Sequence, residues 1–204
     1  MSTTDRPGMS EGTIADQDAD RQRLTFFGKE GEGELFATET MSFPEFPEGI
    51  HEEMAEAGID ITPLAVGNDT TVLFRGKGPD GMSLASAWFA PNYLLPRHSH
   101  DSDCLYYIVR GSIQMGSRTL EAGEGFYINA DGPYAYQAGP EGAEVLEFRR
   151  ETSFDMKIYE KNLDRWKVIA DIGAANAESW AQLRAERDAA QLKLTRRTQH
   201  PHRH

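Results

Sequence analysis

The sequence predicts an all-β domain, an antiparallel sandwich or barrel, with an N-terminal arm and a C-terminal helix. Between residues 61 and 150, short apolar runs alternate with turn residues at a spacing of roughly 8–12 residues, which is typical of antiparallel β domains. No long helical pattern interrupts this region, which disfavours parallel βαβ units. A segment rich in strong helix formers follows only later, at residues 178–194.

Each strand of the β region is expected where β-branched, aromatic or alternating residues lie between turn signals. The expected strands are 70–75, 83–90, 95–100, 105–110, 112–115, 125–128, 134–138 and 145–149. Glycine and proline gather between them and predict the turns, which are 76–81, 110–111, 122–123, 131–133 and 139–142.

The segments before the β region differ from it in composition. Residues 1–23 are polar and predict a disordered leader. Residues 24–60 are expected to form an aromatic arm that ends in a short helix at 47–58. In that helix Ile50, Met54 and Ala57 would share one side, and Gly58 would stop it.

The segments after the β region, 151–195 and 196–204, predict a helical extension and a flexible tail. Within the extension, Trp180, Leu183 and Arg187 recur at helical spacing and give a narrow apolar stripe. We expect this helix to dock on the barrel or on a second subunit.

Length and charge limit the classes of function. The chain has 204 residues, with 21 basic and 33 acidic ones and a net charge of −12. An excess of acid argues against nucleic-acid or anionic-membrane partners, which require clustered Lys and Arg. A single cysteine excludes an internal disulfide, and no signal peptide or apolar run of ~20 residues is present, so a cytoplasmic protein is expected.

The histidines of the stretch Arg97-His98-Ser99-His100 are the strongest candidates for chemistry. Side chains alternate along a strand, so residues at i and i+2 point to the same face. The two imidazoles can therefore converge on one metal ion, a common role of neutral histidine.

Residues 92–111 resemble the first motif of the cupin family, which contains His-x-His, a following glutamate and a later glycine. His98, His100 and Gly111 match this motif, whereas Asn92 stands in place of its first glycine and Cys104 in place of its glutamate. The resemblance implies the cupin double-stranded β-helix, a jelly-roll barrel.

Residues 123–138 resemble the second cupin motif mainly by their register. Gly123 matches, Asn129 and Asp131 replace a proline and a glycine, Tyr134 replaces the histidine, and Ala138 replaces the asparagine. Two of the residues that usually hold the cupin metal are therefore replaced.

The resemblance implies one divalent transition metal, which could be iron, zinc, nickel, copper or manganese. His98 and His100 would hold it, and Cys104 would join them as a thiolate or remain a buried small hydrophobe. Tyr134 and Tyr106 are the candidate catalytic residues, as hydrogen-bond donors or acid–base groups, or else they simply fill the space.

Three carboxylates are reserve ligands that could complete a triad of two histidines and one carboxylate. Asp101 and Asp103 would more simply cap a turn after the histidines. Glu147 lies in an apolar strand, and alternation alone leaves open whether it points inward or outward.

These observations favour a metal-dependent enzyme acting on a small organic molecule inside the barrel, with dioxygenase chemistry ahead of isomerase, cyclase or lyase chemistry. The alternative is a metal-free cupin that binds a small ligand as a sensor or accessory protein. A homodimer is expected, with the aromatic arm and the helix as contact surface.

Overall fold

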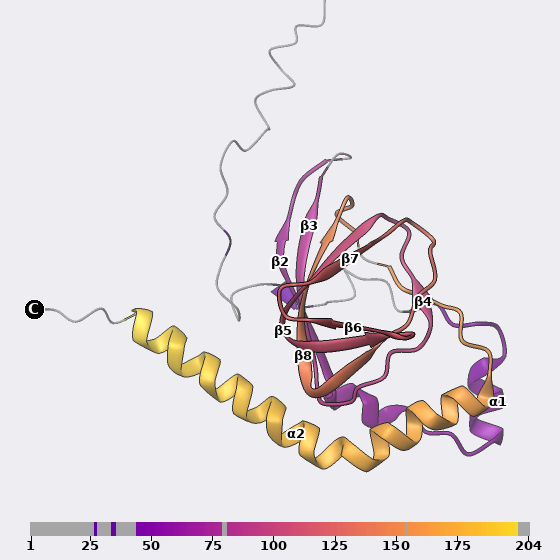
Figure 1. Ribbon diagram of the computed structural model, residues 1–204. Coiled ribbons are helices and arrows are strands. Elements are labelled where there is room, and N and C mark those ends of the chain that lie inside the picture. The colour runs from indigo at the N-terminus through magenta and orange to yellow at the C-terminus, as the bar shows by residue number, and fades with distance from the viewer. Residues whose placement is uncertain (1–26, 28–33, 36–43, 79–80, 154, 200–204) are drawn as a thin grey trace, which may run out of the picture.

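Figure 1 shows the computed structural model, which describes residues 27, 34–35, 44–78, 81–153 and 155–199. The described chain forms an antiparallel β barrel with a long helix running along one end (Figure 1). The leader at 1–23 and most of the expected arm lie outside the described residues, as do the last residues of the tail.

The main sheet follows the order β1-β2-β3-β8-β5-β6, and β7 pairs with β5 beside β6. Every pair in it is antiparallel. The strands are β1 (Glu34–Leu35), β2 (Asn68–Arg75), β3 (Ser83–Phe89), β5 (Cys104–Met115), β6 (Arg118–Glu121), β7 (Gly125–Ile128) and β8 (Gln137–Arg149).

The other side of the barrel is closed by two extended segments that pair mostly through single bridges. The backbones of His98 and Tyr134 exchange two hydrogen bonds of 2.9 Å, and Leu95 N donates to Tyr136 O at 3.0 Å. The short strand β4 (His98–Ser99) also pairs with β9 (Lys157–Ile158). This arrangement confirms the predicted jelly-roll barrel and brings the two motif regions side by side.

Two predicted turns are wrong, because their glycines lie inside long strands. Residues 105–110 and 112–115 form one strand, β5, and residues 139–142 lie within β8. Gly111 has φ 68° and Gly142 has φ 78°, and a Cβ on Gly111 would collide with the carbonyl oxygen of Gly142. The glycines therefore serve close backbone approach and a register shift rather than a chain reversal.

The short helices lie before the barrel. The helix predicted at 47–58 is α1 (Ile50–Glu56), in which Ile50 and Met54 are buried while Ala57, just beyond it, is exposed. Gly58 has φ 67° and ends it as predicted. A 3₁₀ helix, η2 (Thr62–Val66), follows and was not predicted.

The C-terminal helix α2 (Leu163–Gln199) begins well before the predicted residue 178. Asn162 caps it by accepting a 2.8 Å hydrogen bond from the backbone N–H of Asp164. Trp166 and Trp180 are buried against the body, whereas Leu183 is exposed, so the predicted apolar stripe is only partly buried. No helix in the described part of the chain is long and apolar enough to cross a membrane.

Candidate functional site

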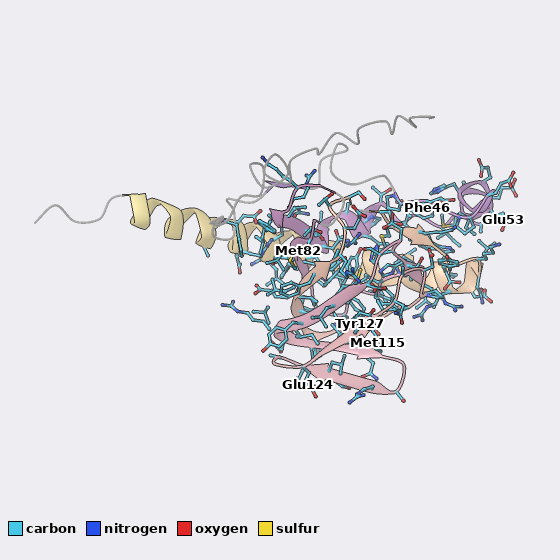
Figure 2. All side chains as sticks on the ribbon, turned by 90° about the horizontal axis from the view of Figure 1, so that it is seen from above. Phe46, Glu53, Met82, Met115, Glu124 and Tyr127 are labelled. Atoms are coloured by element: carbon cyan, nitrogen blue, oxygen red, sulfur yellow. The ribbon has the colours of Figure 1, made fainter. Side chains whose placement is uncertain are left out.

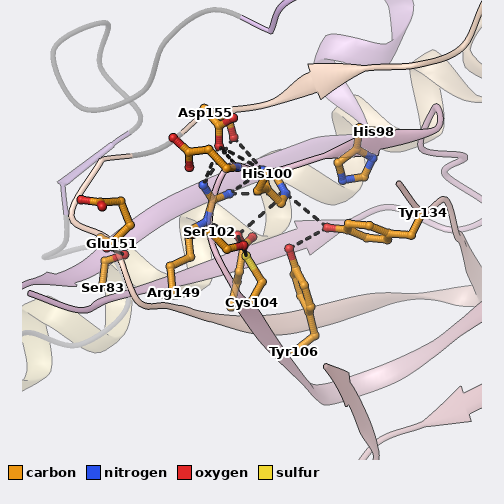
Figure 3. A network of polar contacts seen from close by, with 12 residues as sticks. Ser83, His98, His100, Ser102, Cys104, Tyr106, Tyr134, Arg149, Glu151 and Asp155 are labelled. Carbon is orange, nitrogen blue, oxygen red and sulfur yellow. Dashed lines mark hydrogen bonds and ion pairs between the residues drawn. The ribbon is translucent and has the colours of Figure 1, made fainter. Parts of the chain in front are cut away.

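His98 and His100 lie side by side at one end of the barrel interior, as their spacing predicts. Only 2% of the surface of His98 and 7% of that of His100 is exposed, and their ring centroids are 5.2 Å apart. Tyr134 faces His98 across the closing pair of segments, with ring centroids 4.4 Å apart. The strand alternation thus places the two histidines and Tyr134 on one inner face (Figure 3).

His98 lines the barrel cavity. Its Nδ1 lies 2.8 Å from the carbonyl oxygen of Pro96, which can only accept a hydrogen bond, so Nδ1 carries the proton. Burial, with the neighbouring His100, lowers the pKa of His98 to about 4. The ring is therefore neutral at pH 7, and its Nε2 is a hydrogen-bond acceptor.

His100 begins a chain of hydrogen bonds that runs through two tyrosines. Its Nδ1 donates to the backbone oxygen of Asp155 at 2.6 Å, and its Nε2 lies 3.2 Å from the Tyr134 hydroxyl. The hydroxyls of Tyr134 and Tyr106 are 2.6 Å apart. The structure thus joins the predicted residues His100, Tyr134 and Tyr106 (Figure 3).

A buried ion pair between Glu147 and Arg149 forms the other half of the polar cluster. Both residues lie on β8 at i and i+2 and point inward, which answers the question that alternation alone left open for Glu147. The Arg149 Nε donates to Glu147 Oε1, and Arg149 Nη2 lies 3.0 Å from Nδ1 and 3.4 Å from Nε2 of His100. Arg149 also donates to the Asp155 backbone oxygen at 3.3 Å.

Neither Arg149 nor Asp155 is among the site residues predicted from the sequence. An opposite charge two residues from Glu147, in an otherwise apolar strand, was the available signal for Arg149. Asp155 acts mainly through its backbone carbonyl from an irregular segment, and no side-chain pattern marks such a contact.

The charges of the ion pair reinforce one another. Burial is the largest influence on Glu147 and raises its pKa, but the charge and hydrogen bond of Arg149, together with the two histidines, leave that pKa below its ordinary value. Burial likewise lowers the pKa of Arg149, and the charge and hydrogen bond of Glu147, together with Tyr106 and Cys104, more than reverse this. Both side chains are therefore ionised at pH 7.

The tyrosine hydroxyls remain protonated. Burial, followed by the nearby Glu147 carboxylate, raises the pKa of Tyr106 and of Tyr134 well above 10. Each phenol is a neutral hydrogen-bond donor at pH 7.

Cys104 lies beside the cluster as a neutral thiol. Its side chain is fully buried, and burial raises its pKa to about 11. The Sγ donates to the backbone oxygen of Ser102 at 3.3 Å and lies 3.9 Å from Glu147 Oε1. This environment suits a buried small side chain, the alternative that the sequence left open, better than a thiolate ligand.

The remaining reserve carboxylates lie on the loop after the histidines. Asp103 is half-buried and accepts a 3.0 Å hydrogen bond from the backbone N–H of Ala130, so it caps a turn. Asp101 is exposed, and its backbone N–H donates to Asp155 Oδ1 at 2.9 Å. Partial burial and the neighbouring Asp155 raise the pKa of Asp101 to about 6.

The donor set does not fit a transition metal. In the described part of the chain, no three His, Cys, Asp or Glu side chains are placed to hold a metal ion. Two carboxylate oxygens lie near His100, Asp155 Oδ1 at 3.8 Å from Nδ1 and Glu147 Oε1 at 3.9 Å from Nε2, and both pair with Arg149. The guanidinium that lies against His100 would also repel a dication, because Arg149 stays charged.

The polar cluster forms the floor of a cavity of about 510 Å³. Aromatic and aliphatic side chains form most of its wall, and Arg184 of α2 reaches its mouth. The wall includes Phe89, Tyr93, Leu95, Tyr136 and Met156. A mostly apolar wall with a few converging polar groups is the usual construction of a small-molecule site.

The chain was compared with known families, curated proteins and solved structures. No family model and no curated protein matches the chain. KdgF from Halomonas sp. shares 19% identity over 42% of this chain and 82% of that chain, with a TM-score of 0.35. The polyketide cyclase RemF from Streptomyces resistomycificus shares 20% identity over 50% of this chain and 77% of that chain, with a TM-score of 0.40.

A cupin domain of an XRE family transcriptional regulator from Enterobacter cloacae shares 19% identity over 41% of this chain and 95% of that chain, with a TM-score of 0.36. These solved structures are at most 20% identical to the chain, so the likeness concerns the fold alone. Within the chain, the two motif regions are paired through His98 and Tyr134.

Proposed function

We propose that this cupin binds a small organic molecule in its barrel without a metal ion. The observation that carries the proposal is the Glu147–Arg149 ion pair, whose guanidinium lies against His100 where the imidazole would otherwise face a metal. This ion pair occupies the place beside the histidines where a metal ion would lie, and it forms a fixed polar floor there.

The protonation states support binding rather than acid–base catalysis. A general acid or base works best when its pKa lies near the operating pH. On the cavity floor, the pKa of His98 is about 4, and burial holds the pKa of Tyr134 well above its ordinary value. These groups act as fixed acceptors and donors, which orient a ligand without exchanging protons with it.

The wall and floor together suit a flat aromatic molecule that carries a hydroxyl group. Phe89, Tyr93 and Tyr136 supply aromatic surface, and a cavity of about 510 Å³ falls within the range of about 300–1,000 Å³ common for such ligands. His98 Nε2 would accept a hydrogen bond from the ligand hydroxyl. The ion pair is internally neutral and leaves no net charge on the floor.

The metal-dependent dioxygenase that the sequence favours is the competing function. It would require Arg149 to leave both Glu147 and His100, so that two imidazoles and one carboxylate could converge. Isomerase, cyclase or lyase chemistry would instead require a floor group whose pKa moves towards neutrality when substrate binds.

A matched pair of probes tests the binding proposal. Isothermal titration compares 2-naphthol, which carries one hydroxyl, with 2-methylnaphthalene, in which a methyl group replaces it. We expect the wild-type protein to prefer 2-naphthol by about 3–10-fold, since one hydrogen bond contributes roughly 0.5–1.5 kcal/mol. His98→Phe keeps an aromatic ring but removes the acceptor, so this variant should bind the two probes with about equal affinity.

Asn129→Ala is the control, because Asn129 is exposed and lies outside the cavity lining. It should bind both probes as the wild type does. Equal affinity of the wild type for the two probes, or an unchanged preference in His98→Phe, would refute the role of the cavity floor.

A further inference from the structure

Three tyrosines line the cavity, and their hydroxyl groups differ in their partners. Tyr93, Tyr134 and Tyr136 are each at most 8% exposed. The Tyr134 hydroxyl lies 2.6 Å from that of Tyr106, and the Tyr93 hydroxyl accepts a 2.7 Å hydrogen bond from the side chain of Asn68. The Tyr136 hydroxyl has no hydrogen-bond partner among the residues that the structure describes.

The unpaired hydroxyl of Tyr136 is accessible from the cavity. Tyr136 is only 4% exposed, yet its hydroxyl is not among the buried atoms that are closed off from water. The cavity is the open space that this residue lines. Phe89, almost perpendicular to the ring at a centroid distance of 5.5 Å, and Phe126 at 6.3 Å hold the ring in place.

A buried hydroxyl without a partner indicates that something else binds it. Leaving a buried donor unpaired costs free energy, and nearly all such groups in folded proteins bind protein atoms, ordered water or a ligand. The cavity of about 510 Å³ has room for a small organic molecule beside Tyr136. A ligand group that binds this hydroxyl would therefore account for its position.

The charges around Tyr136 favour a neutral acceptor over an anion. Burial raises the pKa of Tyr136 well above its ordinary value, and the carboxylate of Glu147 and the hydroxyl of Tyr93 raise it further. The hydroxyl is therefore protonated at pH 7 and can donate. The same carboxylate disfavours a second negative charge beside Tyr136, whereas it does not repel a neutral carbonyl oxygen.

His98 and Tyr136 occupy successive positions along the cavity wall. His98 pairs with Tyr134 across the two closing segments, and Tyr136 follows two residues later, roughly 7 Å further along the chain. The ring of Tyr134 contacts both, at centroid distances of 4.4 Å from His98 and 6.1 Å from Tyr136. The acceptor of His98 and the donor of Tyr136 therefore suit two different groups of one ligand.

We infer that Tyr136 selects a ligand that carries a neutral carbonyl group besides its hydroxyl, as a hydroxylated aromatic ketone or aldehyde does. The Tyr136 hydroxyl donates to the carbonyl oxygen, while His98 Nε2 accepts from the ligand hydroxyl. This inference rests on the proposed function, because it concerns the same cavity, and it adds the second polar group of the ligand.

A matched pair of probes tests the carbonyl by isothermal titration at pH 7. The probes are 6-acetyl-2-naphthol and 6-isopropenyl-2-naphthol, in which a methylene group replaces the carbonyl oxygen. We expect the wild type to prefer the acetyl probe by about 3–10-fold, as one hydrogen bond supplies. Tyr136→Phe keeps the ring but removes the donor, so it should bind the two probes with about equal affinity. Comparing variant with wild type cancels any difference between the ring hydroxyls of the two probes.

Tyr127→Phe is the control, because it makes the same change on a tyrosine outside the cavity lining. Tyr127 is 55% exposed and lies on the barrel strands away from Phe46 and Glu53, which mark the end of the molecule near α1 (Figure 2). This variant should keep the wild-type preference. Equal affinity of the wild type for the two probes, or an unchanged preference in Tyr136→Phe, would overturn the inference.

Two further probes separate the inference from the proposed function. If the wild type prefers 2-naphthol to 2-methylnaphthalene but binds the acetyl and isopropenyl probes equally, the proposed function stands and the inference alone fails. If none of the naphthols binds, both fail. A third probe, 6-hydroxy-2-naphthoate, carries a carboxylate and should bind more weakly than the acetyl probe; tighter binding would overturn the choice of a neutral carbonyl.

The stability of the ligand-free protein gives an independent readout. Tyr136→Phe removes a hydroxyl that has no partner, so it should not lower the midpoint of unfolding in guanidinium chloride. A lower midpoint would show that the hydroxyl is already bound in the free protein, and it would overturn the inference.

Discussion

At the residue scale, the site depends on Arg149, which connects a carboxylate, an imidazole and a backbone carbonyl. Its side chain is 2% exposed, and its partners Glu147 and His100 are nearly as deeply buried. A buried ion pair contributes little net stability compared with apolar residues, but removing one partner leaves an unpaired charge in the interior. The arginine therefore shapes the cavity floor more than it stabilises the fold.

Replacing Arg149 should destabilise the protein strongly. We expect Arg149→Met to lower the free energy of unfolding by about 3–5 kcal/mol, because Glu147 loses its compensating charge. The double variant Glu147→Leu with Arg149→Met should recover more than half of that loss. Guanidinium chloride unfolding measures both changes.

The control for this series is Lys167→Met, which breaks an exposed ion pair with Asp171 on α2. Exposed pairs contribute little, so its midpoint of unfolding should stay near that of the wild type. An Arg149→Met variant as stable as this control would show that the ion pair is not formed in solution.

The neutral, buried His98 makes stability dependent on pH. Its pKa is about 4 in the folded chain, against about 6.5 for an unperturbed histidine, so the unfolded state binds more protons between those values. The neutral ring contributes its full share to the free energy of unfolding above pH 6.5. That contribution falls by roughly 2–3 kcal/mol as the pH drops towards 4. His98→Phe should flatten this slope.

Unfolding of wild type and His98→Phe at a series of pH values measures the slope. Identical slopes for the two proteins between pH 6.5 and 4 would contradict the assignment of a buried neutral ring. Other groups titrate in this range, so the difference between the two curves is the relevant quantity.

The residue pattern identified the two histidines and both tyrosines, because alternation on a strand determines which side chains share a face. Alternation does not determine whether a polar residue in an apolar strand faces in or out, and Glu147 was left undecided for that reason. The neutral state of Cys104 depends on its burial and on Glu147, and neither is visible in the local sequence.

At the element scale, glycine has two structural roles that the local sequence does not distinguish. The glycines at 122–123 and 131–133 mark turns as predicted, whereas Gly111 and Gly142 permit two long strands to approach each other. Their pairing partners are distant along the chain, so rules based on local sequence could not distinguish a turn glycine from a glycine inside a strand.

The start of α2 was missed for a related reason. Residues 163–177 include Val168, Ile172 and Gly173, which are weaker helix formers than the segment after 178. Packing of Trp166 and Ile169 against the body stabilises this half of the helix.

Trp180 should be the main anchor of α2 on the barrel. It is 1% exposed, contacts the ring of Tyr93 and donates a 3.0 Å hydrogen bond to the backbone oxygen of Pro91. We expect Trp180→Ala to lower the free energy of unfolding by about 3–5 kcal/mol, and Leu183→Ala, one turn further on, to change it by less than about 0.5 kcal/mol. Hydrogen exchange of α2 amides would show the undocking; full protection of α2 in Trp180→Ala would contradict this role.

At the scale of the whole molecule, the barrel has an inner and an outer surface, because successive side chains of each strand point to opposite faces. The inward residues Glu147 and Arg149 of β8 line the cavity, whereas the outward residues Leu105, Tyr107 and Val109 of the neighbouring β5 are exposed. The sequence predicted the barrel because its strand spacing and motif positions are local, whereas the contents of the cavity depend on contacts between distant segments.

The most direct test of the account is the metal content of the protein. His200, His202 and His204 are first replaced by alanine, so that the tail cannot chelate metal, and the chain is purified without chelator and offered iron, zinc, nickel, copper and manganese. Elemental analysis should find only a small fraction of one equivalent of any of them per chain. One equivalent of a single metal, lost on His98→Ala, would contradict the ion-paired floor and restore the metal-dependent enzyme.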